Sequence, residues 1–343
     1  MNVAEAIAAV VSRKNLREED AWGVMGQIMD GGATPAQIGA LLVGLRMKGE
    51  TGAEITGFAR AMRDRSSKVE SKRTGILDTC GTGGDAIKTF NLSTAAAIVA
   101  SAAGVPVAKH GNRAVTSACG SADVLEALGV DIAVDPKSAG EMLDAIGLAF
   151  LFAPAYHTAM KNVAGPRKEL GLRTVFNLIG PLTNPAGAEY QLIGVYSPTL
   201  VPKIARALQR LGCVRGAVVH GLIGLDEVSP IGATRLALIE RGKITDKVVQ
   251  AEDFGIAPPS LEQLVCDGIE QSALKLRTAI SDAGSAEAAA IIPSAAVALW
   301  LAGKEADFAS AASLARETIG SGAAARKLEE LAAASGRVQA VSK

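Results

Sequence analysis

The sequence ILDTCGTGGD, residues 76–85, decides the fold of this chain, because the spacing of apolar residues changes here. Before it, apolar residues recur at helical intervals. Within it, Ile76 and Leu77 predict a short strand that runs into a loop with three glycines in four positions, Gly81 to Gly84. After it, short apolar strands alternate with helices. This alternation predicts an α/β fold with a central, mainly parallel sheet.

The predicted elements beyond this loop follow the same rhythm. Strands are expected at 105–108, 148–152, 191–196 and 217–220, and helices from Ser93 to Gly104, over 123–128, from Pro136 and over 200–211. The end of the chain is rich in alanine and is expected to be helical. In parallel sheets of this kind, ligands bind beyond the carboxyl ends of the strands. Polar residues that follow strands are therefore the candidates for a site.

Residues 1–70 predict a small N-terminal helical domain. Thr34 with Pro35 and Gln37, and Thr51 with Glu54, are capping signals that mark helix starts. A polar, basic stretch over 63–73 is expected to link this domain to a larger α/β domain over 74–343.

The composition excludes several classes of protein. The 343 residues contain 35 Lys and Arg and 35 Asp and Glu, so no basic excess favours nucleic acid as a partner. The N-terminus has no signal-peptide pattern, and the most apolar stretch, 288–303, is short for a membrane helix and contains Pro293. These features predict a soluble, cytoplasmic protein with no membrane partner.

Three polar segments follow or end predicted strands: the glycine loop, Asn91-Leu92-Ser93-Thr94 at a helix start, and KHGNR over 109–113. Each has an ordinary structural explanation, namely a turn, a helix cap and a solvated charged patch. All three would lie at one edge of the sheet, where backbone N–H groups, a helix N-terminus and cations favour an anionic, phosphate-rich ligand. Thr116, Ser117 and Ser121 extend the polar lining.

Two downstream features complete the candidate site. Asp226 and Glu227 follow a strand; such a pair is usually a surface feature, but beside phosphate it suits Mg²⁺. Arg167 is exposed by default, and its guanidinium suits a carboxylate substrate. The three histidines are too scattered for a zinc site, and no nucleophile triad is evident.

The chain resembles the anthranilate phosphoribosyltransferases in GTGGD at 81–85, NLST at 91–94, KHGNR at 109–113, GSADVLEALG at 120–129, RKELGLRTVFNLIGPLTNPA at 167–186 and GLDE at 224–227. TPAQIGALL and LRMKGET, within 34–51, match the N-terminal region of that family. The resemblance covers nearly the whole chain. It implies a homodimer formed through the helical domain, which takes in a later segment near 167–188. It also implies transfer of the phosphoribosyl group of phosphoribosyl pyrophosphate to the amine of anthranilate, an early step of tryptophan biosynthesis.

The resemblance also implies site residues. Anthranilate would contact Gly81, Asn112 and Arg167, and Mg²⁺ would bind Ser93, Asp226 and Glu227. No residue is assigned as a catalytic acid or base; Lys109 and Mg²⁺ would stabilise the transition state, and the role of His110 stays open. Phosphoribosyl pyrophosphate would be lined by Gly81, Gly84, Asp85, Thr89, Asn91, Leu92, Ser93, Thr94, Lys109, His110, Gly111, Asn112, Arg113, Ala114, Val115, Thr116, Ser117 and Ser121.

Three segments depart from the pattern of that family: 86–88, 222–223 and 292–294, where Ile292-Pro293-Ser294 stands in place of the usual Leu-Asn start to an alanine-rich helix. Two other functions remain open. A pyrimidine nucleoside phosphorylase shares the architecture, although the NLST and GLDE segments argue against it. A relative that binds nucleic acid is disfavoured by the zero net charge.

Overall fold

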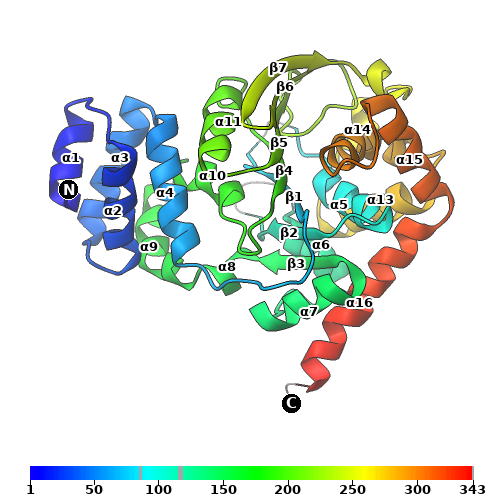
Figure 1. Cartoon of the computed structure of the whole chain (residues 1–343), viewed down its shortest axis with the longest axis horizontal. Helices are drawn as coiled ribbons and strands as arrows, with labels where there is room; N and C mark the ends of the chain where they lie inside the picture. The colour runs from blue at the N-terminus through cyan, green and yellow to red at the C-terminus, as the bar shows by residue number, and fades with distance from the viewer. Residues whose placement is uncertain (85–86, 115–118, 342–343) are drawn as a thin grey trace.

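The computed structural model describes residues 1–84, 87–114 and 119–341, with side chains described as far as residue 336. The predictions for Asp85, Val115, Thr116 and Ser117 therefore lie outside the described residues. The chain forms a helical part and a larger part built on one sheet (Figure 1). This architecture confirms the expected fold class.

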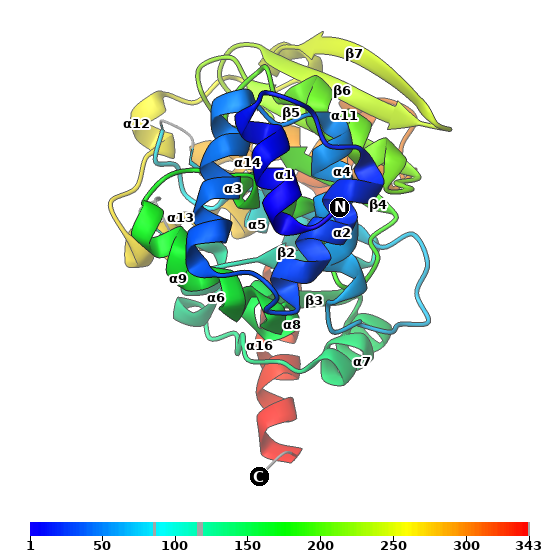
Figure 2. The same cartoon turned by 90° about the vertical axis from the view of Figure 1, so that its left-hand side faces the viewer.

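The helical part begins with α1 (Val3–Val11), α2 (Glu18–Met29), α3 (Pro35–Lys48) and α4 (Gly52–Asp64). Both predicted capping boxes are present: the Thr34 and Thr51 hydroxyls accept hydrogen bonds from the backbone nitrogens of Gln37 and Glu54. Helix α4 reaches Asp64, so the connection to the sheet is shorter at its start than predicted. Figure 2 shows these helices in front of the sheet.

The sheet orders seven strands as β3-β2-β1-β4-β5-β6-β7. The first five pair in parallel, and β5, β6 and β7 pair antiparallel. Their bounds are β1 (Leu77–Gly81), β2 (Val107–Gly111), β3 (Leu148–Phe152), β4 (Tyr190–Gly194), β5 (Arg215–Gly221), β6 (Thr234–Glu240) and β7 (Lys243–Val249). The β6–β7 hairpin was not among the predicted strands; Arg241 and Gly242, both with positive φ, form its turn.

The two faces of the sheet belong to two different cores. Leu192 and Val219 face one core, and Ile193 and Val218 face the other, as the two-residue period of a strand requires. The first core contains α5 (Leu92–Ala102), α6 (Ser121–Ala127), α7 (Pro136–Ile146), α13 (Ile269–Ser281), α14 (Ala286–Leu301), α15 (Phe308–Gly320) and α16 (Ala323–Val341). The second contains α1 to α4 with α9 (Lys161–Leu170), α10 (Phe176–Ile179) and α11 (Val201–Arg210). The short elements α8 (Ala153–Tyr156) and α12 (Leu261–Leu264), with three 3₁₀ turns at Thr158–Met160, Gly180–Leu182 and Ala251–Phe254, complete the fold.

One local prediction was wrong. The second strand begins at Val107 and continues to Gly111, so Lys109 and His110 lie within it instead of after it. Pro293 lies inside the continuous helix α14 and is buried there. Among the described residues, no single helix has the length and apolar character to cross a membrane, although α13 and α14, bent by 73°, meet both criteria as a pair.

Candidate active site

A cleft of about 290 Å³ opens at the carboxyl ends of β1 and β2 and reaches α9 and α10. Most of the residues predicted for the site line this cleft: Gly81, Gly84, Thr89, Asn91, Leu92, Ser93, Lys109, His110, Gly111, Asn112, Arg113, Ser121, Arg167, Asp226 and Glu227. Two others, Thr94 and Ala114, were predicted for the site but do not line the cleft, and Thr94 is buried in α5. The described strand-end segments therefore share one site, as the parallel sheet predicted.

The glycine loop is held at each described residue. The backbone nitrogen of Thr82 donates to the Gly194 carbonyl at 2.9 Å, and its hydroxyl accepts from the Tyr196 nitrogen at 3.2 Å. Gly83 and Gly84 have φ of 65° and 80°, a region that side chains disfavour. The backbone of the loop is consequently fixed against the cleft and can approach a ligand closely.

Asp226 and Glu227 are inside the site, not on the surface. Asp226 Oδ2 accepts a hydrogen bond from Gly83 N at 2.8 Å. Glu227 Oε1 accepts from Ser93 N at 3.0 Å, and Oε2 accepts from the Ser294 hydroxyl at 3.2 Å. Burial raises the pKa of the Asp226 carboxyl, against the opposing effect of its hydrogen bond from Gly83. The pair thus joins the glycine loop, the start of α5 and α14.

Lys109 places a buried cation beneath the cleft. Its Nζ donates to the Thr79 carbonyl at 2.5 Å and lies 3.4 Å from the Ser93 hydroxyl. In the neighbouring strand, Asp78 accepts from the His110 backbone nitrogen at 3.0 Å. Burial raises the pKa of Asp78 to about 6, although the charge of Lys109 opposes the shift. The cation is therefore held by β1 and α5 and does not extend into solvent.

The remaining members of KHGNR differ in their surroundings. Arg113 is partly exposed, and its guanidinium contacts Asp123 at 2.9 Å and Glu126 at 2.5 Å. Its charge is thus already paired with two carboxylates. Asn112 Oδ1 accepts from the Arg113 backbone nitrogen at 2.8 Å, which fixes the turn after β2.

His110 is buried, with its ring 5.3 Å from that of His157. Burial lowers the pKa of His110 to about 3 and that of His157 to about 4. Both rings are therefore neutral near pH 7 and add no positive charge to the cleft.

Two arginines reach the cleft from the segment that contains α9 and α10. Arg167 lies over the ring of Phe176 at 4.9 Å, and burial lowers its pKa. Arg173 lies over the ring of Tyr196 at 4.6 Å and donates from Nη2 to the Gly84 carbonyl. Arg173 was missed by sequence analysis, because its partners Gly84 and Tyr196 are distant in the chain.

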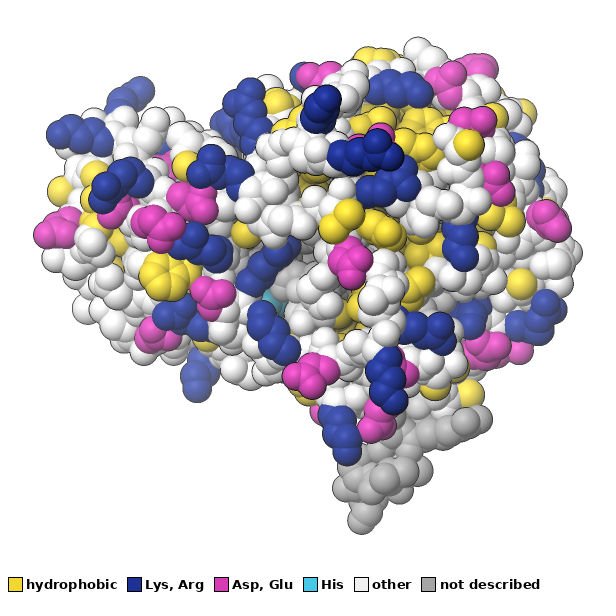
Figure 3. Space-filling view, viewed as in Figure 1, with side chains coloured by type: hydrophobic (Ala, Val, Ile, Leu, Met, Phe, Trp, Pro, Cys, Tyr) yellow, Lys and Arg dark blue, Asp and Glu magenta, His cyan; other side chains and the backbone are white. Residues whose placement is uncertain are grey.

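The charges outside the cleft are mixed. On the face shown in Figure 3, Lys and Arg side chains are interspersed with Asp and Glu over both parts of the molecule.

Among the residues that the structure describes, no group of three or more His, Cys, Asp or Glu could hold a metal ion. The residues that line the cleft nevertheless include two carboxylates, Asp226 and Glu227, and the hydroxyl of Ser93, all of which carry oxygen donors.

Known proteins resemble the chain over nearly its whole length. Residues 73–325 match the family described as "Glycosyl transferase family, a/b domain", and residues 4–66 match its "helical bundle domain". The anthranilate phosphoribosyltransferase of Pelotomaculum thermopropionicum is 50% identical over 333 residues, covering 96% of this chain and 95% of the relative.

Solved structures agree with these matches. The crystal structure of the enzyme of the same name from Thermus thermophilus has a TM-score of 0.90 and 43% identity, covering 96% of this chain and 98% of that one. The Saccharomyces cerevisiae enzyme in complex with phosphoribosyl pyrophosphate and Mg has a TM-score of 0.88 and 29% identity, covering 98% of each chain. The yeast enzyme has also been solved with 4-fluoroanthranilate, with a TM-score of 0.87, 28% identity and the same coverage.

Proposed function

The chain belongs to the anthranilate phosphoribosyltransferases of the glycosyl transferase family, and from that premise we infer that its cleft is the site of phosphoribosyl transfer. The enzyme transfers the phosphoribosyl group of 5-phosphoribosyl 1-pyrophosphate to the amine of anthranilate, giving N-(5-phosphoribosyl)anthranilate and pyrophosphate, in tryptophan biosynthesis. The observation that carries this conclusion is the convergence of the glycine loop, the start of α5 and Lys109 on one cleft.

We propose that phosphoribosyl pyrophosphate binds along the glycine loop and α5. Backbone N–H groups at a helix start and in a glycine loop attract phosphate, and Lys109 adds a buried positive charge. As the bond from the anomeric carbon to pyrophosphate breaks, negative charge grows on the leaving group. Donors that are already fixed stabilise this charge without reorganisation.

Magnesium fits the oxygen donors that Ser93, Asp226 and Glu227 bring to the cleft. Two carboxylates and a hydroxyl are hard oxygen ligands, and Mg²⁺ commonly binds through one or two carboxylates plus substrate phosphates. Ser93, Asp226 and Glu227 would hold it. When bound, Mg²⁺ supplies positive charge that offsets the charge of pyrophosphate. The yeast relative was solved in complex with phosphoribosyl pyrophosphate and Mg, which supports the use of Mg²⁺ by this chain.

Anthranilate is proposed to bind between Gly81, Asn112 and Arg167. The Arg167 guanidinium is held against Phe176 and can pair with the carboxylate, which directs the amine toward the anomeric carbon. The aromatic amine is neutral near pH 7 and attacks without a strong base. Its nitrogen forms the new bond as pyrophosphate leaves with the bonding electrons, and the amine then releases a proton.

The helical domain and the dimer are further proposals. Helix α9 packs against α2 and α3, which supports the inclusion of a segment near 167–188 with residues 1–70.

On the helical part, Val11 and Met47 are 66% and 74% exposed. Exposed apolar side chains of this kind support a homodimer formed there, and light scattering of the purified protein would measure its mass.

A fluorescence assay tests the activity. Loss of anthranilate fluorescence should require the protein, phosphoribosyl pyrophosphate and Mg²⁺ together, with pyrophosphate released in equal amount. Phosphorolysis of uridine or thymidine without consumption of phosphoribosyl pyrophosphate would instead assign the cleft to a nucleoside phosphorylase.

A further inference from the structure

The contacts of the glycine loop come from two directions. The sheet side supplies the Gly194 carbonyl to Thr82 and the Asp226 carboxylate to Gly83. The last described residue of the loop, Gly84, is instead contacted by Arg173, which lies between α9 and α10. The described part of the loop is therefore fixed by the sheet side at Thr82 and Gly83, and at Gly84 by the segment that also carries Arg167.

The contact between Arg173 and Gly84 is closely fitted. A Cβ atom built on Gly84 would lie 2.5 Å from Nη2 and 2.6 Å from Cζ of Arg173. The φ of Gly84 is also positive, at 80°. A side chain at this position would therefore strain the backbone and displace the guanidinium from the Gly84 carbonyl.

The Tyr196 ring sets the position of the guanidinium. Arg173 Cζ lies 4.6 Å from the centroid of that ring, and the backbone nitrogen of the same tyrosine donates to the Thr82 hydroxyl. One residue thus supports both Arg173 and the loop that Arg173 contacts. A planar guanidinium suits this arrangement because it can lay its flat face on a ring while its N–H groups donate within its plane, whereas an ammonium has no flat face.

We propose that Arg173 is a positioning residue for the donor substrate: it holds the Gly84 carbonyl so that the glycine loop stays shaped for pyrophosphate. This inference rests on the proposed function and deepens it. Because Arg173 and Arg167 share one segment, the loop that binds the donor is physically linked to the residue that binds the acceptor.

The proposal predicts a selective kinetic effect. A hydrogen bond from a charged donor typically changes a binding constant by about tenfold or more. Arg173→Gln should therefore raise the KM for phosphoribosyl pyrophosphate about tenfold, while the KM for anthranilate at saturating donor changes less than about threefold. Arg173→Lys should give an intermediate KM, since it keeps the charge and loses the stacked fork.

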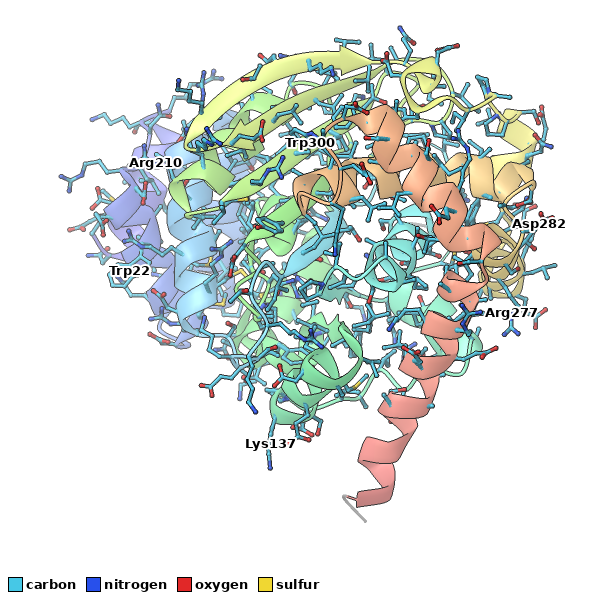
Figure 4. The ribbon with its side chains drawn as sticks, turned by 45° about the vertical axis from the view of Figure 1, so that its right-hand side comes forward. Trp22, Lys137, Arg210, Arg277, Asp282 and Trp300 are labelled. Atoms are coloured by element: carbon cyan, nitrogen blue, oxygen red, sulfur yellow. The ribbon has the colours of Figure 1, made fainter. Side chains whose placement is uncertain are left out.

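The matched control is Arg277→Gln, which removes an exposed arginine of α13 that Figure 4 labels at the surface. This variant should retain both wild-type KM values. Unfolding temperatures of all variants would separate a positioning effect from a loss of stability. The proposal is overturned if Arg173→Gln keeps the donor KM within twofold, or if the two KM values rise together.

Hydrogen–deuterium exchange gives a readout that does not need turnover. Amides of a peptide ending at Gly84 should exchange faster in Arg173→Gln than in the wild type, and the control peptide of α13 should not change. Unchanged exchange in the loop would overturn the inference. If the wild-type protein does not consume anthranilate, the proposed function is overturned. The exchange experiment would still test whether Arg173 holds the glycine loop, because it does not depend on turnover.

Discussion

The carboxylate of Asp226 accepts a hydrogen bond from the backbone nitrogen of Gly83 at 2.8 Å, so a proposed metal ligand directly contacts the proposed phosphate loop. The metal and phosphate sites are therefore one connected structure. Changes that displace Asp226 are expected to affect donor binding as well as magnesium binding.

Gly194→Ala should show this connection. A Cβ at Gly194 would lie 1.5 Å from the carbonyl oxygen of Asp226, so the backbone there must move. We expect turnover to fall at least about tenfold and the free energy of unfolding to fall by about 1–3 kcal/mol, as overpacking typically costs. Steady-state kinetics and denaturant unfolding measure both.

The control for that variant is Gly39→Ala in α3, where nothing lies within 4 Å of the added Cβ. It should leave turnover unchanged and stabilise the helix by about 0.5–1 kcal/mol. Wild-type turnover in Gly194→Ala would show that the position of Asp226 is not critical.

Asp226→Ala combined with Glu227→Ala should abolish magnesium-dependent turnover while the protein stays folded. The two substitutions remove the carboxylates that reach the cleft. Turnover measured over a range of Mg²⁺ concentrations, with circular dichroism as the test of folding, gives the answer. Asp246→Ala, an exposed carboxylate of β7, is the matched control and should behave as wild type. Undiminished kcat in the double variant would remove the metal assignment.

Arg167→Ala should mainly raise the KM for anthranilate, by about tenfold or more, because a charged hydrogen-bond partner of the carboxylate is lost. The KM for phosphoribosyl pyrophosphate should change much less. Lys161→Ala, an exposed residue of the same helix, serves as the control. An unchanged KM for anthranilate would exclude Arg167 from the acceptor site.

The buried histidines predict how stability depends on pH. Burial lowers the pKa of His110 to about 3 and that of His157 to about 4, whereas the unfolded chain titrates near pH 6.5. The unfolded state therefore binds more protons, and stability falls as the pH drops from about 6.5 towards these values. Asp78, whose pKa burial raises to about 6, opposes this effect between about pH 6 and 4, because its native form binds the extra proton.

His157→Leu tests this prediction. Each buried histidine contributes a slope of about 1.4 kcal/mol per pH unit inside its window, so removing one should flatten the curve by about that amount. Urea unfolding at pH 7, 6 and 5 measures the slope. A variant that matches the wild-type slope would show that His157 is not the group that titrates.

The positions of the strands and of most cleft residues could be predicted, because the glycine loop and KHGNR lie next to the strand ends that bring them together. Contacts between distant parts of the chain could not. Arg173 meets Gly84, and Ser294 meets Glu227, only because the sheet and α14 bring these segments together. The burial of Pro293 could not be predicted either, because it depends on helices that are distant in the sequence. This proline lies inside α14, which packs against α5, α13 and α15.

The β6–β7 hairpin had a signal that could have been used. The short apolar run from Leu236 to Ile239 is followed by Arg241-Gly242, where the glycine favours a turn, and then by the β-branched residues of 244–249. By contrast, the ion pairs of Arg113 could not have been predicted, because the sequence does not show that Asp123 and Glu126 point back at the turn after β2.

One core unites α1 to α4 with one face of β4, β5 and β6, although a family boundary falls between residues 66 and 73. The helical part therefore cannot swing as a free lid on a flexible tether. Any opening of the cleft must slide the apolar surfaces of α2, α3 and α4 past those of α9, α10 and α11, so small shear movements are expected in place of a wide hinge. A fragment cut at the family boundary would also expose the apolar surfaces of α9, α10 and α11 that α2, α3 and α4 cover, and we expect it to aggregate.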